Sequence, residues 1–170
     1  GFLASKGKYI DQLKESKWQF FSELTSGALV SEEEFSKNLR NGISIKYYSD
    51  STVAEKINYA ADIKNGEWLR YYPDGTLNLR TSFTNGKING KFEAYFENGK
   101  TEFSGFYKYD LKDGLWRIYN LDGSIKYEIE YVLGETKSRV LDIQQSDYID
   151  SLEKNRMNIA DPEKNPGIWQ

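Results

Sequence analysis

Apolar and polar positions alternate along short stretches of the chain, and the alternation restarts at a regular interval. One stretch places apolar or small side chains at every second residue, and a later one repeats it: Leu77, Leu79, Thr81, Phe83, then Ile125, Tyr127, Ile129, Tyr131. Over four such stretches, twelve of the sixteen in-phase positions are apolar, against two of the twelve between them. A period of two indicates half-buried β-strands and not helices.

The alternation belongs to a repeat of 24 residues. Four glycines mark registered copies at this interval: Gly42, Gly66, Gly90 and Gly114. Each copy carries a tyrosine five places after its glycine, and all but the first carry an aromatic two places after it: Tyr47, Tyr71, Tyr95 and Tyr119, then Trp68, Phe92 and Trp116. Such a period is typical of arrays in which each unit covers its neighbour.

A turn signal follows in each copy, and Pro73-Asp74-Gly75 contains the clearest one. Proline presets φ at the second position of a type I turn, and the glycine takes the left-handed position that closes it in a bulge. This geometry pairs Tyr72 with Thr76 and Tyr71 with Leu77. Each unit is therefore predicted to be a strand, a tight turn and a second strand.

The hairpins are expected to follow one another along most of the chain. Sequences such as Lys64-Asn65-Gly66 lead into the next unit, and we expect an array over residues 1–143 with units near 16–41, 42–65, 66–89, 90–113 and 114–137. Alignment with the repeat makes Tyr9 to Lys17 a strand end and a loop, although its composition is helix-like. The fold class is all-β, with tandem β-hairpin repeats forming an elongated, meandering antiparallel sheet.

The tail, residues 144–170, is expected to cap the array. Val140 and Ile143, just before it, keep the apolar positions of a further partial unit. Ser146-Asp147 can cap a short helix over Tyr148 to Met157. Pro162 and Pro166 then mark an irregular end.

Two segments carry a family resemblance. The string Gly66-Glu-Trp-Leu-Arg-Tyr-Tyr-Pro-Asp-Gly75, echoed by Gly114-Leu-Trp-Arg-Ile-Tyr-Asn-Leu-Asp-Gly123, resembles the MORN-variant repeat of the YwqK-family antitoxin-like proteins. The resemblance covers roughly residues 16 to 137. It implies an elongated sheet of hairpins and, in some members, neutralisation of a toxin by binding it. The units at 16 and 42 depart from the pattern, because they lack the Asp/Asn-Gly turn.

The turn register assigns the aromatics to two faces. Because Tyr71 is paired with Leu77, the tyrosine row is expected to share the main core with the alternating apolar row. The opposite face then carries a second aromatic row among polar residues, which predicts a candidate partner-binding face: Trp68, Arg70, Tyr72, Arg80, Phe92, Phe96 and Trp116. A second core, a structural pair with Trp68 lying over Arg80, and a contact between copies of the chain are the alternatives.

Composition removes most catalytic chemistry. The chain has no cysteine and no histidine, so it has no thiolate nucleophile, no imidazole base and no Cys or His metal ligand. Glu128 and Glu130 share a strand face at a generic spacing, which is weak support for a glycosidase-like pair. We expect no enzyme, no cofactor and no metal site.

The remaining motifs have structural interpretations. Asp50, Asp74 and Asp122 precede turn positions, and we interpret them as turn residues, not calcium ligands. Gly105 interrupts the apolar row, which predicts a bulge or a close approach. The run Glu32 to Glu34 is interpreted as a solvated strand or loop, with contact to a basic partner as the alternative.

These observations favour a protein-binding module of the antitoxin or immunity type. A self-assembling structural protein of the cell envelope and a carbohydrate-binding module are the alternatives. The net charge of −3 leaves no footprint for nucleic acid, and no apolar run approaches the length of a transmembrane segment. The first residue is Gly1 and not Met, which is typical of a processed chain, so an exported location is expected over a cytoplasmic one.

Overall fold

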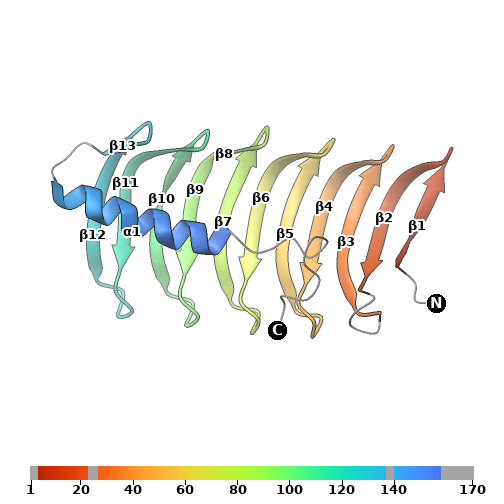
Figure 1. The fold of residues 1–170 in the computed structure, drawn as a ribbon, viewed down its shortest axis with the longest axis horizontal. Helices are drawn as coiled ribbons and strands as arrows, with labels where there is room; N and C mark the ends of the chain where they lie inside the picture. Colours follow the sequence, from red (N-terminus) through yellow and green to blue (C-terminus); the bar gives the residue numbers. More distant parts are fainter. Residues whose placement is uncertain (1–3, 23–26, 137–139, 158–170) are drawn as a thin grey trace.

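The structure, a computed structural model, describes residues 4–22, 27–136 and 140–157. Thirteen strands form one antiparallel sheet in which strands adjacent in sequence pair, except that β7 pairs with both β8 and β9 (Figure 1). The strands are β1 (Ser5–Ile10), β2 (Leu13–Phe21), β3 (Leu29–Ser36), β4 (Leu39–Tyr47), β5 (Val53–Ala60), β6 (Ile63–Tyr71), β7 (Leu77–Thr84), β8 (Lys87–Ile88), β9 (Gly90–Tyr95), β10 (Thr101–Lys108), β11 (Leu111–Tyr119), β12 (Ile125–Val132) and β13 (Glu135–Thr136). The predicted meander of hairpins is confirmed.

Turns of one kind close the four hairpins from β4 to β12 as the sequence predicted. Tyr72 N–H donates to Thr76 O at 2.8 Å and Gly75 N–H donates to Tyr72 O at 2.9 Å, while Tyr71 pairs with Leu77. Gly75 has a φ of 85°, which only glycine adopts readily. The predicted type I turn with its glycine bulge is confirmed.

Turns of a second kind join the units at the opposite end of the strands. Between β5 and β6 the turn is Ala61-Asp62, with φ values of 49° and 65°. Paired positive φ values give a two-residue turn whose twist matches the flanking strands. The predicted junction Lys64-Asn65-Gly66 lies inside β6, so the chain reverses earlier than the sequence indicated.

A bulge beside each hairpin turn decides which side chains share a face. Tyr71 lies opposite Leu77, but its neighbour Arg70 lies opposite Leu79, so the strands slip by one residue between the two pairs. Residues on β6 therefore change phase relative to β7. Trp68 lies opposite Thr81, on the face of the apolar row. The predicted face assignment is wrong for this reason: the tryptophan row belongs to the core face, and the tyrosine row does not.

Two rows of cross-strand partners define the faces of the sheet. The inner row runs Ser5, Phe20, Ser31, Lys46, Glu55, Arg70, Leu79, Ala94, Phe103, Ile118, Tyr127. The outer row runs Lys6, Gln19, Glu32, Ile45, Lys56, Leu69, Arg80, Glu93, Ser104, Arg117, Glu128. We call these faces the inner face and the outer face.

Helix α1 (Val140–Met157) follows the sheet and extends across it from β12 towards β7 (Figure 1). Ile149 is fully buried in the core cluster with Trp116 and Ile129, and Leu152 packs against the same cluster, so α1 covers the inner face. The helix begins eight residues before the predicted Tyr148. Val140 and Ile143 belong to it and not to a strand, and Ser146-Asp147 lies within it, so these predictions were wrong. Pro162 and Pro166 lie outside the described residues.

At the other end of the chain, the strand end predicted within Tyr9 to Lys17 is confirmed, but the predicted loop is only two residues long, because Leu13 to Lys17 belong to β2. β1 ends at Ile10, Asp11-Gln12 make a two-residue turn, and β2 starts at Leu13. The connection between β2 and β3 lies largely outside the described residues. In the part of the chain that is described, no helix has the length and apolarity that a membrane span requires.

Candidate functional site

The residues predicted as a partner-binding face do not lie together. Four are buried or nearly so on the inner face: Trp68, Arg70, Phe92 and Trp116. Arg80 lies on the outer face, across from Glu93. Tyr72 and Phe96 lie at the hairpin turns and line a shallow hollow with Leu121. The predicted pair of Trp68 over Arg80 is also wrong, because the two side chains point to opposite faces, and Lys64 lies over the Trp68 ring instead.

On the inner face, an aromatic cluster holds α1 against β10, β11 and β12. Trp116 has no exposed surface, and its ring lies 5.2 Å from that of Tyr107 and 6.1 Å from that of Tyr131. The Tyr131 hydroxyl donates to Ser146 Oγ of α1 at 3.0 Å. Gly105 makes room for the indole, because a Cβ there would stand 2.1 Å from Trp116 Cδ2. The predicted close approach at Gly105 is confirmed.

A buried ionic cluster joins the same strands to the helix. Lys112 Nζ pairs with Asp150 and lies 3.3 Å from Glu153 Oε2, which also accepts a hydrogen bond of 2.8 Å from the Tyr107 hydroxyl. Burial raises the pKa of Glu153, and the Lys112 charge opposes only part of that rise. Burial acts to lower the pKa of Lys112, but the two carboxylates outweigh it and hold that pKa above its usual value.

Over β3 to β6 the inner row of cross-strand partners is polar. Lys46, Glu55 and Arg70 are consecutive members of the inner row, and Lys46 Nζ lies 3.6 Å from Glu55 Oε1. Glu55 Oε2 accepts a hydrogen bond of 3.0 Å from Trp68 Nε1. Buried Ser44 takes the position that a bulky residue holds in later units. In this row charges and hydrogen bonds join the strands, while Ile57 and Trp68 beside it are buried and belong to the apolar core cluster.

The acidic run at residues 32–34 belongs to a strand, β3, as predicted, but two of its three residues are not solvated. Glu32 and Glu33 are buried on opposite faces. On the outer face, Glu32 pairs with Lys17 at 2.6 Å and accepts hydrogen bonds from Gln19 and Tyr47. Burial acts to raise the pKa of Glu32, but these three partners lower it overall.

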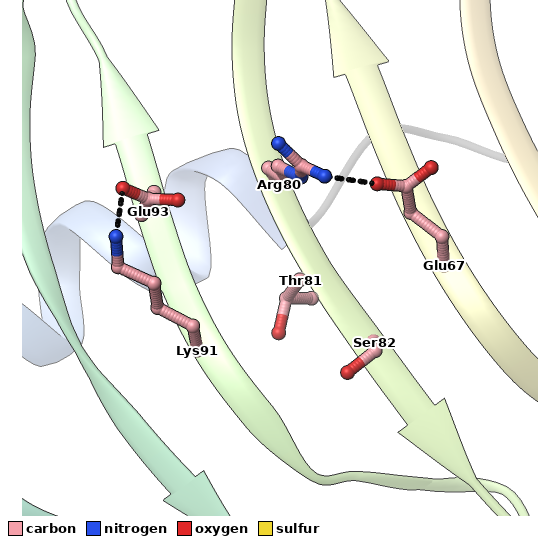
Figure 2. Close-up of a pocket in the computed structure, with 6 residues that line it drawn as sticks. All are labelled: Glu67, Arg80, Thr81, Ser82, Lys91 and Glu93. Atoms are coloured by element: carbon pink, nitrogen blue, oxygen red, sulfur yellow. Dashed lines mark ion pairs between the residues drawn. The ribbon is translucent and has the colours of Figure 1, made fainter.

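The outer face carries paired charges around a shallow depression between β6, β7 and β9. Arg80 pairs with Glu67 at 2.9 Å, and Lys91 pairs with Glu93 at 2.7 Å (Figure 2). With Thr81 and Ser82, these residues line a volume of about 400 Å³. In the same view α1 lies behind the sheet. The Ser82 hydroxyl donates to Asn89 O at 2.6 Å, at the point where β8 and β9 separate.

The tyrosine row follows the outer face along the array. Lys56, an outer-row residue, places its Nζ 5.8 Å from the Tyr71 ring, and the Tyr47 hydroxyl donates to Glu32 at 3.0 Å. Burial, followed by the hydrogen bond to Glu32, raises the pKa of Tyr47 to about 12. Burial also raises the pKa of Tyr71 and Tyr95. These phenols stay neutral near pH 7 and act as large amphipathic contact groups.

The acidic residues at the hairpin turns serve the backbone. A carboxylate oxygen of Asp50, Asp74 and Asp122 each accepts a backbone N–H two residues on, at 2.8 Å. The interpretation as turn residues is confirmed. Among the described residues, no group of three acidic side chains is placed to hold a metal ion.

The outer-face residues were not predicted, because the bulge beside each hairpin turn is not visible in the sequence pattern. Glu67, Leu69, Tyr71, Ser82, Lys91, Glu93 and Tyr95 were absent from the predicted site. One feature of the sequence could have revealed the correct faces. Trp68 on the first strand of the hairpin and Leu79 on the second are both large and apolar. A single sheet can bury both residues most simply on the same face. This arrangement requires a bulge, which changes which residues of β6 point to that face.

Three consecutive segments of the chain, residues 64–85, 88–109 and 112–132, match the model of the MORN repeat variant. Each segment corresponds to one hairpin unit, from β6 to β12. No curated protein matches the chain. MORN repeats generally serve as protein- or membrane-binding modules, and this repeat family is not a known enzyme family. Over residues 64–132 the chain is therefore similar to MORN-variant repeats, and these three units lie within a longer array of hairpins.

Proposed function

We propose that the chain is a non-enzymatic protein-binding module whose partner lies against the outer face of the sheet. One observation carries the proposal. The outer face, which lies opposite α1, presents a row of partly exposed tyrosines beside a row of alternating charges: Tyr47, Tyr71, Tyr95 and Tyr119, then Arg80, Glu93, Arg117 and Glu128.

This composition is suited to protein recognition. Tyrosine supplies a large, rigid contact area at a low cost in side-chain entropy. Charges of both signs at fixed positions favour a partner with the complementary pattern and disfavour others. Arg80 and Arg117 hold their fork geometry through ion pairs with Glu67 and Glu128 at 2.9 Å and 2.7 Å, so they reach a partner already oriented.

The specific form that we propose is binding of the antitoxin or immunity type, in which the partner is a toxic protein whose functional surface the array covers. Support comes from the resemblance of residues 66–75 and 114–123 to the repeats of YwqK-family antitoxin-like proteins. Co-expression with the product of a neighbouring toxin-like gene tests this form. Rescue of growth is expected, and growth arrest despite expression of both chains contradicts it.

Site-specific photo-crosslinking in the producing organism tests which surface binds. A photoreactive amino acid at Leu69, on the outer face, is expected to capture one protein in near-stoichiometric yield. The same group at Leu121, which is 58% exposed at a hairpin turn, is the matched control and should capture little. Arg80→Glu should reduce the Leu69 adduct by about tenfold, because it reverses one charge of the row. Equal yields from both positions, or no adduct, would refute the outer-face proposal.

A further inference from the structure

Two units of the array, at opposite ends, share a set of four residues at the same repeat positions. We call them the Trp18 box and the Trp116 box: Gly7, Tyr9, Lys14 and Trp18, then Gly105, Tyr107, Lys112 and Trp116. The five-residue spacing between tyrosine and lysine, and the four-residue spacing from lysine to tryptophan, are identical in the two boxes.

The boxes also have the same geometry. A Cβ on Gly7 would stand 2.1 Å from Trp18 Cδ2, just as one on Gly105 would stand 2.1 Å from Trp116 Cδ2. Each indole N–H donates to a backbone carbonyl of the preceding strand, at 3.3 Å to Lys8 and 3.2 Å to Phe106. The tyrosine meets the indole edge-on in both, with ring centroids 4.8 Å and 5.2 Å apart.

The corresponding unit in the middle of the array differs. Ile57 occupies the position of the glycine, so no ring can lie flat against the backbone there. Trp68 donates its N–H to the Glu55 carboxylate and not to a carbonyl. The box is therefore a feature of the two ends, and not a consequence of the repeat alone.

The Trp116 box shows what such a box binds. Its lysine pairs with Asp150 and Glu153 of α1, its tyrosine donates to Glu153, and buried Ile149 of α1 belongs to the same core cluster as its tryptophan. The box thus accepts an amphipathic helix through two carboxylates three residues apart and one adjacent apolar side chain.

The Trp18 box has the same groups, and no helix of the described residues lies against it. Lys14 Nζ lies 4.7 to 5.0 Å from the ring centres of Trp18, Phe20 and Phe35. Among the described residues no carboxylate lies within ion-pair distance of this ammonium, and no helix covers β1 to β3. Tyr9 is 58% exposed.

We infer that the Trp18 box is a second docking site, which takes an acidic amphipathic helix of a partner protein by the contacts that hold α1 at the Trp116 box. A second copy of this chain fits less well, because its α1 would have to leave its own box. Glu33 also stands opposite Trp18 where Ile129 stands opposite Trp116, so the site suits a helix more polar than α1. This site lies on the inner face and is separate from the outer-face site proposed above.

A synthetic peptide of residues 140–157 is a suitable probe, because it carries the carboxylate pair in a helix-forming sequence. The intact chain keeps its own α1 at a high effective concentration on the Trp116 box, so added peptide should bind at the Trp18 box. Titration by calorimetry should give one site per chain. Lys14→Met should weaken binding by at least about tenfold, because it removes the charge-assisted contacts. A peptide with Asn and Gln in place of Asp150 and Glu153 should lose a similar factor.

Lys64→Met is the matched control, since Lys64 holds the same repeat position over Trp68 in a unit without the glycine. It should leave the affinity unchanged, and circular dichroism should show both variants folded. A spin label on the peptide should broaden the indole resonance of Trp18 and spare that of Trp116.

Three results would overturn the inference: no saturable binding, equal loss with Lys14→Met and Lys64→Met, or broadening at Trp116, which would mean displacement of α1. A dimer in sedimentation that the peptide dissociates would also overturn it, by showing that a second copy is the occupant. The crosslinking at Leu69 does not depend on any of these results, so the two proposals fail separately.

Discussion

The inner face of this sheet is built differently in its two halves. From β7 to β12 the inner row is apolar, running from Leu79 to Tyr127, and α1 covers it. From β3 to β6 the same row carries Ser31, Lys46, Glu55 and Arg70. One repeat geometry therefore supports two kinds of cohesion. Turns and strand ladders set the backbone of the array in both halves, and α1 lies over the half whose inner row is apolar.

The largest expected difference between the halves follows from removing the tryptophan of each box. Trp116→Ala should lower the free energy of unfolding by about 3–5 kcal/mol, because it leaves a cavity under α1 that cannot collapse. Trp18→Ala should cost about 1–2 kcal/mol less, since the neighbouring Lys14 and Phe20 are only half-buried and can close over the space. Urea denaturation measures both, and equal losses would contradict the comparison.

The lysines of the boxes should differ next. Lys112→Met should cost about 3 kcal/mol, because it leaves the Glu153 carboxylate buried without its cation. Lys14→Met should cost only about 0.5–1 kcal/mol, the worth of its contacts with aromatic rings. The double variant Lys112→Met with Glu153→Leu should recover most of the loss. Hydrogen exchange of α1 and chemical denaturation report the result, and a double variant as unstable as the single one would argue against a buried ionic lock.

Acid should act on the two halves in opposite directions. The pKa of Glu32 is lowered in the folded protein. The stabilisation that this carboxylate provides is therefore fully present at pH values above its pKa in the unfolded chain, about 4.3. It is lost as the pH falls through the pKa of the folded state. The pKa of Glu153 is raised in the folded protein. The stabilisation that its carboxyl group provides is therefore present at low pH and is lost as the pH rises through the pKa of the folded state.

Glu32→Gln should therefore cost about 1.5–2 kcal/mol at pH 7 and almost nothing at pH about 3. Hydrogen exchange, corrected for the intrinsic pH dependence, should show β2 and β3 opening before β10 and β11 as pH is lowered. Uniform opening along the array would contradict this prediction.

The smallest expected effect concerns the hairpin turns. The Tyr48 hydroxyl donates to Tyr71 O at 2.6 Å and the Tyr72 hydroxyl donates to Tyr95 O at 2.7 Å, whereas the next unit has Phe96 at that position. Phe96→Tyr should stabilise the array by about 0.5–1 kcal/mol by adding the missing bond, and Tyr72→Phe should destabilise it by a similar amount. Thermal denaturation compares the two; a destabilised Phe96→Tyr variant would show that the hydroxyl has no acceptor there.

Local patterns predicted much of this architecture. The period of two, the 24-residue interval and the Pro73-Asp74-Gly75 turn were sufficient for hairpins in a meander, and the pairing of Tyr71 with Leu77 is as predicted. The candidate site was predicted less well. Of its seven residues, Arg80 lies in the outer row, while Trp68, Arg70, Phe92 and Trp116 lie inside.

The sequence by itself determined the repeat, the strands and the hairpin turns, because each depends on residues within a few positions of one another. Only the tertiary structure decided which aromatic row is buried. That outcome depends on a register shift of one residue between Arg70 and Tyr71. The shift places all residues of the strand beyond it on the opposite face. The alternation of apolar and polar residues does not reveal it. The length of α1 also lay outside the local pattern: the helix begins at Val140, where another strand was predicted, and its Ser146 accepts a hydrogen bond from Tyr131 of the sheet.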